Sequence, residues 1–341
     1  LYRRVVVSMI MTLPTTQPKR ILALSQPNHT VVVTPPTPQP VSVGEEIRYE
    51  LRVNLPIAEL RNFVIRDQLP VGLRCVQAPA VDLGPSGPHA VAGFAPGGII
   101  TPTCTDTLVE WNFGNQALTN GAGITTYDFA INFIGRIENT ANTNNGNLIA
   151  NGTAPSVVAA SYTNSLGTVV TLPIGAVSVQ VQEPIIALTQ TITPATGDAG
   201  DHMTITVTAT NTGTGAAYNL RVLNNLTTLG RLSYVGGSVG GLDPPDVVDT
   251  ATLGANQPIF IWNLANPNYT IAPGSSRSFT YRVSVNGNVQ PHEIISNLLQ
   301  AKWDSLPSRN TALNSSCLVG IDGSASGLLN GALPNAGVQP N

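Results

Sequence analysis

Two stretches of alternating residues, far apart in the chain, constrain the fold more than any other feature of the sequence. Residues 43–54 read VGEEIRYELRVN and residues 199–210 read AGDHMTITVTAT, with Gly44 matching Gly200. A period of two places successive side chains on opposite faces of a β-strand, so every second residue is expected to face a core. These inward residues are Ile47, Tyr49, Leu51 and Val53 in the first stretch, and Met203, Ile205, Val207 and Ala209 in the second.

The match between the two halves of the chain continues in the same order beyond these stretches. The further pairs are NFVIRDQL (62–69) with NLRVLNNL (219–226), VEWNFG (109–114) with FIWNLA (260–265), and TYDFAINF (126–133) with SFTYRVSV (278–285). Trp111 thereby falls opposite Trp262. Four matched segments in one order, with similar gaps, predict an internal duplication.

Short strands joined by turns account for the rest of the chain. The 32 Gly and 27 Pro follow no collagen-like period, and no segment has a convincing helical period. Additional strands are expected at 157–164, 168–172 and 177–182. Many short strands with turn signals between them predict an all-β fold of tandem immunoglobulin-like β-sandwich domains.

The expected organisation has four parts. Residues 1–24 form an N-terminal extension with a candidate donor strand, 25–183 and 184–310 form the two sandwich repeats, and 311–341 form a Gly/Ser/Asn-rich C-terminal loop or tail. The apolar run VVVSMIMTL (5–13) has the length of a signal-peptide core, but no A-x-A-like cleavage site follows it. We interpret it as a strand within a piece of a longer precursor, which would present an exposed edge.

Charge and hydropathy exclude several classes of partner. Charged residues make up 10% of the chain and the net charge is -3, without a cluster of Lys and Arg. Nucleic-acid binding depends on many basic contacts to phosphates, so no nucleic-acid partner is expected. No segment approaches the roughly 18 apolar residues of a membrane helix, so we expect no membrane insertion of this segment.

The three cysteines are Cys75, Cys104 and Cys317. They lack the tight clustering of a thiolate zinc site. Cys75 and Cys104 lie in the same repeat and are a candidate disulfide that would attach a long loop to the sheet. The alternative is two unrelated buried thiols, since free cysteine is often buried. Cys317 has no obvious mate and is expected to be free or to pair with another chain.

Signals of catalysis are absent from the sequence. HEIIS (292–296) carries Ser296 where a zinc peptidase has its second histidine, and neither a P-loop nor a G-x-S-x-G motif occurs. The histidines are scattered without an evident acidic partner, and His202 is expected on the outward side of its strand; the four are His29, His89, His202 and His292. We therefore expect no catalytic, cofactor-binding or metal-binding residues, and no enzyme.

The sequence gives little support for a calcium site or for N-glycosylation. Three aspartates share the loop DPPDVVD and a fourth lies near the C-terminus, but their spacing does not match an EF-hand; they are Asp243, Asp246, Asp249 and Asp322. A solvated loop is the expected reading, and structural calcium stays unsupported. The N-x-[ST] sequons, at Asn28, Asn151, Asn225, Asn268 and Asn314, are no more frequent than chance predicts.

The repeated segments resemble a family of bacterial and archaeal surface-protein repeats called domain of unknown function 11. The resemblance is carried by AGDHMTITVTATNTGTGAAYNLRVLNNL (199–226), by the W-N-L segment at Trp262, by IAPGSSRSFTYRVSV (271–285) and by ISNLLQAKWDSLP (295–307). The first repeat keeps VGEEIRYELRV and RDQLPVGL. The resemblance implies immunoglobulin-like sandwiches in a secreted or wall-attached protein.

One departure from the family concerns an internal crosslink. Relatives often carry Lys in the first strand, and some related sandwiches form a Lys–Asn isopeptide bond there. Here that position is Gln190 in the second repeat, and Gln26 stands in a comparable place in the first. Gln supplies no amine nucleophile, so no isopeptide is expected at these positions. The only lysines are Lys19 and Lys302.

The favoured function is a structural, non-enzymatic subunit of an extracellular assembly such as a filament, sheath or surface layer. Few charges oppose close neighbours, and an apolar N-terminal strand is suited to donation into the sheet of a neighbouring copy. Its partners would be copies of itself or other surface proteins. The alternative is an adhesin or ligand-binding stalk module of a large cell-surface protein.

Overall fold

The alternating segments form β-strands whose apolar sides are buried. Strand β3 (Glu46–Pro56) buries Ile47, Tyr49, Leu51 and Val53, and β17 (His202–Asn211) buries Met203, Ile205, Val207 and Ala209. Both inward faces are those predicted from the period of two. The predicted strands at 157–164, 168–172 and 177–182 also form, as β13 (Val158–Thr163), β14 (Val169–Pro173) and β15 (Val177–Val181).

The structure is a computed structural model, and it describes a defined part of the chain. The described residues are 19–26, 29, 31, 38–119, 126–140, 142–226, 230–251, 254–262, 270–306 and 338–340. The apolar run 5–13, Cys317, Asp322 and most of the expected C-terminal tail lie outside them.

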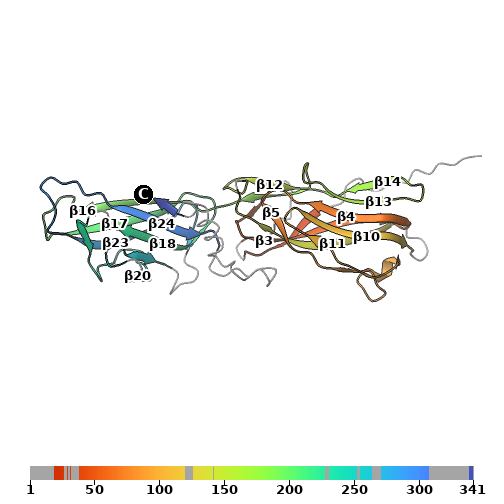
Figure 1. The fold of residues 1–341 in the computed structure, drawn as a ribbon, viewed down its shortest axis with the longest axis horizontal. Coiled ribbons are helices and arrows are strands. Elements are labelled where there is room, and N and C mark those ends of the chain that lie inside the picture. Colours follow the sequence, from red (N-terminus) through yellow and green to blue (C-terminus); the bar gives the residue numbers. More distant parts are fainter. Residues whose placement is uncertain are drawn as a thin grey trace, which may run out of the picture. The chain divides into compact units, whose positions relative to one another are not determined.

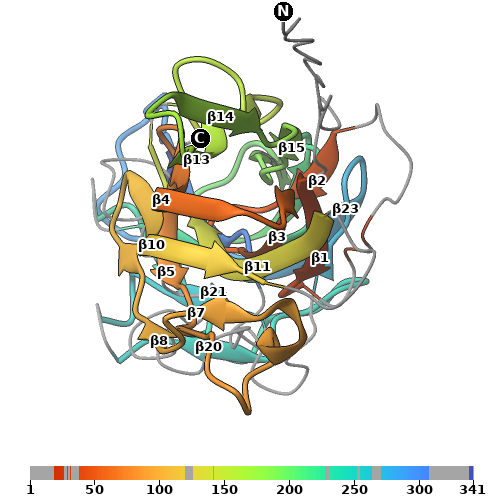
Figure 2. The same ribbon diagram turned by 90° about the vertical axis from the view of Figure 1, so that its right-hand side faces the viewer.

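The first sandwich consists of two main sheets (Figures 1 and 2). One has the strand order β1 (Lys19–Leu24), β3, β11 (Thr126–Ile137), β5 (Leu73–Gln77). The other has the order β14 (Val169–Pro173), β13 (Val158–Thr163), β4 (Glu59–Gln68), β10 (Leu108–Leu118), β7 (Phe94–Ala95), and β9 (Thr103–Cys104) also pairs with β10.

Smaller elements accompany these sheets. Strands β12 (Leu148–Asn151), β15 (Val177–Val181) and β2 (Gln39–Val41) form a three-stranded sheet. Strand β6 (Val81–Asp82) pairs with β8 (Ile99–Ile100), and a single 3-10 turn spans Ala90–Ala92.

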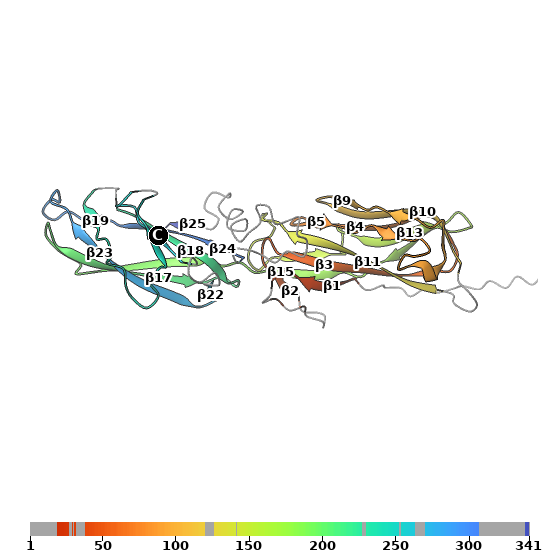
Figure 3. The same cartoon turned by 90° about the horizontal axis from the view of Figure 1, so that it is seen from below.

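The second sandwich again has two sheets (Figure 3). The first has the order β16 (Ile186–Thr193), β17, β23 (Ser276–Val285), β19 (Leu232–Tyr234). The second has the order β20 (Val247–Asp249), β21 (Ile259–Ile261), β18 (Ala217–Asn225), β24 (Leu298–Asp304), β25 (Val338–Pro340), and β22 (Thr270–Ile271) also pairs with β18.

Corresponding strands occupy corresponding places in the two sandwiches. The order β1-β3-β11-β5 parallels β16-β17-β23-β19, and β13-β4-β10 parallels β24-β18-β21. The matched tryptophans are both buried, and each indole N–H donates to a backbone carbonyl at 3.2 Å: Trp111 to Pro79 and Trp262 to Asp243. This correspondence agrees with the duplication inferred from the sequence, and the all-β tandem sandwich architecture is confirmed.

Grouped by the proximity of their Cα atoms, the described residues form two compact units. The first contains residues up to Ala23, Ile47–Gly135 and Ala150–Ser178, and the second contains Leu24–Glu46, Arg136–Ile149 and Val179 onward. Strand β1, which falls in the segment expected to be an N-terminal extension, is part of the first main sheet.

Candidate functional site

A lysine that the sequence placed outside the repeats is sealed inside the first sandwich. Lys19 is the first residue of β1, and its side chain is 0% exposed. Its Nζ lies 2.5 Å from Oδ2 of Asp67, whose side chain is also 0% exposed. Asp67 lies near the end of the central strand β4, with Val109 of β10 and Val158 of β13 as its strand partners. Lysine and aspartate are almost never fully buried unless they are paired.

An asparagine amide completes the cluster. Asn151, the last residue of β12, is buried, and its Nδ2 lies 3.5 Å from the same Oδ2 of Asp67 that receives Lys19. One carboxylate oxygen therefore lies between an amine nitrogen and a carboxamide nitrogen. Oδ1 of Asp67 and Oδ1 of Asn151 are buried and have no hydrogen-bond partner among the described atoms.

Aromatic rings enclose the amine on another side. Nζ of Lys19 lies 4.9 Å from the ring centroid of Tyr49 and 5.5 Å from that of Phe133. The two rings stack at a centroid distance of 5.0 Å. They attract a cation through the ring faces, and they exclude water from the amine.

Burial changes the protonation of both ionisable groups. It lowers the pKa of the Lys19 ammonium from 10.5 to about 8, although the neighbouring Asp67 opposes the change. Burial also raises the pKa of the Asp67 carboxyl, against the opposing effects of Lys19 and Asn151. Both shifts favour transfer of a proton from the ammonium to the carboxylate, because a low-polarity site disfavours charge. A neutral amine, a carboxylic acid and a carboxamide are the components of an acyl transfer.

The position assigned to Gln26 from the sequence is wrong. Gln26 follows the end of β1, and its backbone N–H donates to Oε1 of Glu45 at 3.4 Å. The inward polar residue on the first strand of this sandwich is Lys19. The sequence contained a signal for its partner, because Asp67 follows Phe63 and Ile65 at the inward phase of an alternating strand, where an apolar residue is expected.

The second sandwich holds neutral groups at the matching place. Asn224, which matches Asp67 in the repeat, is buried and hydrogen-bonded to the Tyr281 hydroxyl. Gln190 on β16 donates from Nε2 to the backbone carbonyl of Asn297 at 2.7 Å and accepts from Asn297 Nδ2 at 2.7 Å. Burial raises the pKa of the Tyr281 hydroxyl. These contacts of the second sandwich are made by carboxamides and a tyrosine hydroxyl, where the first sandwich has an amine and a carboxylate.

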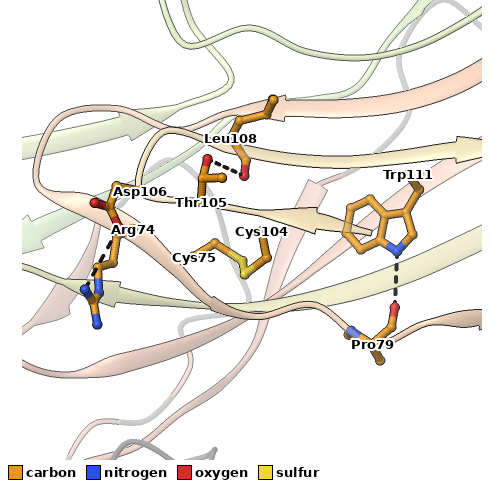
Figure 4. Close-up of a disulfide and its surroundings, with 8 residues drawn as sticks. All are labelled: Arg74, Cys75, Pro79, Cys104, Thr105, Asp106, Leu108 and Trp111. Carbon is orange, nitrogen blue, oxygen red and sulfur yellow. Dashed lines mark hydrogen bonds and ion pairs between the residues drawn. A yellow bond between two sulfur atoms is a disulfide. The ribbon is translucent and has the colours of Figure 1, made fainter. Parts of the chain in front are cut away.

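The predicted cysteine pair forms a disulfide (Figure 4). Cys75 on β5 and Cys104 on β9 have Cα atoms 5.4 Å apart and are separated by 29 positions. Strand β5 belongs to one main sheet, while β9 pairs with β10 of the other. The disulfide therefore links the two sheets of the first sandwich, close to the Trp111–Pro79 hydrogen bond drawn in Figure 4.

The histidines include one acidic pair that the sequence did not reveal. Nδ1 of His29 lies 2.8 Å from Oε2 of the buried Glu45, an acidic partner that was not evident from the sequence. His89 packs against Phe129 at a centroid distance of 4.5 Å. His202 is exposed on the outward side of β17, as expected.

Two aspartates of the loop at residues 243–249 accept hydrogen bonds from nearby protein groups. Oδ1 of Asp243 accepts from Arg277 Nη1 at 2.9 Å, and Oδ1 of Asp249 accepts from the backbone N–H of Ala251 at 2.9 Å. Within the described ranges, no group of three or more His, Cys, Asp or Glu residues is arranged to hold a metal ion. Among the same residues, no helix is long and apolar enough to cross a membrane.

Comparison with known proteins gives distant structural likenesses. No protein-family model and no curated protein sequence matches the chain. Among solved structures, it is similar to the major pilin BcpA of Bacillus cereus, with 9% identity, 79% of this chain and 55% of the pilin covered, and a TM-score of 0.31. It is also similar to the major pilin SpaD of Corynebacterium diphtheriae, with 12% identity, 72% and 57% covered, and a TM-score of 0.30.

A third likeness is to the collagen adhesin CNA of S. aureus, with 10% identity, 86% of this chain and 90% of the adhesin covered, and a TM-score of 0.24. The chain spans just over half the length of the two pilins. At these identities the similarity concerns the general fold alone.

Proposed function

We propose that the chain is a structural, non-enzymatic subunit of an extracellular assembly, joined to its neighbours by β-strand donation. The observation that carries this proposal is a sheet edge of the first sandwich that no described strand covers. Strand β14 is the end strand of its sheet, and apolar side chains are exposed on it and beside it. Val169 is 68% exposed, Leu166 in the preceding turn 87%, and Val157 53%. Proteins normally protect such an edge with charges, a bulge or a covering segment.

The hydrogen bonds of the β13–β14 pair define which backbone groups face outward. The pair is bounded by a bond from Asn164 N–H to the Thr168 carbonyl and one from Ile174 N–H to the Val158 carbonyl. Antiparallel ladders alternate between bonded and non-bonded pairs, so the N–H groups of Val169 and Thr171 point to the open edge. An extended segment can pair with these groups by β-augmentation.

The proposed occupant is the apolar run 5–13 of a second copy. Its nine residues are long enough to pair along the whole of β14, which spans Val169–Pro173. A strand donated from one copy into the next makes a head-to-tail contact, which builds a filament when its rotation does not close. The only strongly perturbed amine described, Lys19, is inaccessible to an external substrate, which favours a structural role over catalysis. The repeats that resemble domain of unknown function 11 support the same assignment and an extracellular location.

Replacement of Thr171 by Pro tests the acceptor edge. Proline removes the outward N–H without removing a bond to β13, so the fold is retained while strand addition is weakened. We expect wild-type protein and the matched control Thr171→Ser to form polymers in electron micrographs and light scattering. Thr171→Pro should remain monomeric with an unchanged circular dichroism spectrum.

Deletion of residues 1–18 tests the donor. The deletion stops short of β1, because residues 19–24 belong to the sheet of the first sandwich. Monomers are expected from this variant. Polymers that persist in both variants contradict strand donation. Wild-type protein that remains monomeric, with no filament or lattice in native material, favours the stalk module instead.

A further inference from the structure

We infer that Lys19 and Asn151 become joined by an intramolecular amide bond, with Asp67 transferring the protons, so that the first strand of the first sandwich is covalently locked to the end of β12. This inference concerns the inside of one sandwich and does not depend on the assembly proposed above. It uses the only amine described in the interior of the protein and the carboxamide that shares its acceptor.

The first argument is the arrangement of the three polar groups around a single oxygen. Nζ of Lys19 and Nδ2 of Asn151 both contact Oδ2 of Asp67, at 2.5 Å and 3.5 Å. The two nitrogens are therefore no further apart than these two contacts laid end to end. Holding a nucleophile and an electrophile in one cluster raises their effective concentration relative to free groups in solution.

The second argument is that two buried polar atoms of the unreacted cluster lack hydrogen-bond partners among the described atoms. Oδ1 of Asn151 and Oδ1 of Asp67 are buried without a hydrogen-bond partner among the described atoms. A buried polar atom without a partner costs about 1–3 kcal/mol. Half a turn of the Asn151 carboxamide about its Cβ–Cγ bond exchanges Nδ2 and Oδ1 and brings the carbonyl oxygen to Asp67 Oδ2. A proton carried by Asp67 can then be donated to that oxygen, which activates the carbonyl carbon toward attack.

The reaction balances with the groups present. Asp67 takes a proton from the Lys19 ammonium, which leaves a neutral amine and a carboxylic acid. Nζ attacks Cγ of Asn151 while Asp67 gives its proton to the amide oxygen, so that the Nζ–Cγ bond forms. Asp67 then accepts one of the two protons on Nζ and delivers it to Nδ2, the Cγ–Nδ2 bond breaks, and ammonia leaves. The proton on the former amide oxygen returns to Asp67 as the carbonyl re-forms, so the products are a neutral amide, ammonia and the Asp67 carboxylic acid. No oxidant, reductant or other reactant takes part.

Asn151 is a better acyl donor than Asp67 in this arrangement. A reaction at the Asp67 carboxyl would expel water and would consume the only acid, among the residues that the structure describes, that contacts the amine. A reaction at Asn151 leaves Asp67 free to act as the proton carrier between the two nitrogens that its Oδ2 contacts. The two products differ in mass, since one loses ammonia and the other loses water.

The surroundings stabilise the product. The Tyr49 and Phe133 rings and the fully buried side chains keep water away from the new amide, so hydrolysis is suppressed. Asn151 is also part of an N-x-[ST] sequon, but it is 1% exposed and its amide nitrogen contacts Asp67, which makes it inaccessible to a glycan. The crosslink, rather than glycosylation, accounts for the environment of this asparagine.

The location of the bond gives it a mechanical role. Strand β1 is the end strand of its sheet and follows directly on residues 1–18. Force applied to the N-terminal segment enters the sandwich at Lys19, the first residue of β1. A covalent bond at that residue prevents the strand from being peeled off its neighbour β3.

The intact mass of the full chain, after reduction of disulfides, tests the inference. We expect a mass about 17 Da below the sequence value, equal to one ammonia. Tryptic digestion should yield a peptide ending at Arg20 joined to a peptide that contains Asn151, identified by fragmentation. A wild-type chain of full mass overturns the inference, and a deficit of about 18 Da with a link to Asp67 overturns the role of Asn151.

Asn151 is followed by Gly152, and an Asn-Gly pair can lose ammonia by closing on its own backbone. Lys19→Met distinguishes this reaction, because it removes the amine and keeps a long apolar side chain. The variant must regain the full mass; a deficit that persists in it contradicts the crosslink. Asp67→Asn should also have the full mass, since it lacks the proton carrier, while Gln190→Glu in the second sandwich should keep the deficit.

Discussion

At the scale of single residues, the cluster around Lys19 is a poor source of stability until it reacts. Moving an ammonium and a carboxylate out of water costs several kcal/mol for each ion, and their attraction seldom returns more than this cost. Amide formation removes the charge from the amine and leaves Asp67 able to stay neutral, as its raised pKa favours. The reaction therefore relieves the desolvation penalty while it forms a bond.

The variant Asn151→Ala keeps the unreacted amine and should reveal its titration. The Lys19 pKa of about 8 in the folded protein is below the ordinary 10.5, so the unfolded chain binds more protons between these pH values. The free energy of unfolding of the variant should therefore rise with pH from about 8 to about 10.5, by a few kcal/mol at most. Below about pH 8 this gain is absent.

Urea titrations between pH 7 and pH 10.5 measure this effect, with wild-type protein as the control. The amide nitrogen of the crosslinked protein does not titrate, while other groups, such as the Tyr281 hydroxyl, contribute equally to both proteins. The difference between the two proteins thus isolates Lys19. Parallel pH profiles for variant and wild type contradict a titratable buried amine.

At the scale of strands, the disulfide joins elements that backbone pairing alone holds weakly. Strand β9 consists of Thr103–Cys104, and only two of its residue pairs connect it to β10. The disulfide attaches this short strand to β5 in the opposite sheet. Its effect on stability comes mainly from restricting the unfolded chain.

The double variant Cys75→Ala/Cys104→Ala should lower the free energy of unfolding of the first sandwich by about 3.6 kcal/mol, the value expected for a loop closed across 29 positions. Denaturant unfolding followed by the fluorescence of buried Trp111 measures the change. Wild-type protein treated with reductant provides a second comparison. Equal midpoints for oxidised wild type and the variant contradict a stabilising role for the disulfide.

The alternation of apolar residues was enough to predict the strands, their inward faces and the duplication, because burial of one sheet face imposes that pattern directly. The same pattern contained the anomaly of Asp67, a carboxylate at an inward position. The cluster itself was missed because Lys19, Asp67 and Asn151 are separated by 48 and 84 positions. Only the pairing order of the strands brings them together, and alternation does not specify that order.

At the scale of the whole chain, the two related sandwiches differ in the bonds and polar contacts that hold their strands together. The first has a disulfide between its sheets and a Lys–Asp–Asn cluster, and the second has the Gln190–Asn297 amide pair and the Asn224–Tyr281 hydrogen bond. Both have well-buried aromatic cores, so the difference lies in covalent restraint rather than in packing. A chain built in this way should have one part that resists unfolding more strongly than the other.

Heating the wild-type protein should therefore give two calorimetric transitions, and the upper one should belong to the first sandwich. Lys19→Met should lower the upper transition by on the order of 10 °C and leave the lower one in place, since a crosslink that closes a long loop contributes several kcal/mol. The signals of Trp111 in the first core, and of Trp262 and Trp303 in the second, assign the transitions. Val222→Ala in the second core is the matched control, and it should lower only the lower transition. A single transition that both variants shift equally would mean that the two sandwiches unfold as one unit, and it would contradict a crosslink that acts on the first sandwich alone.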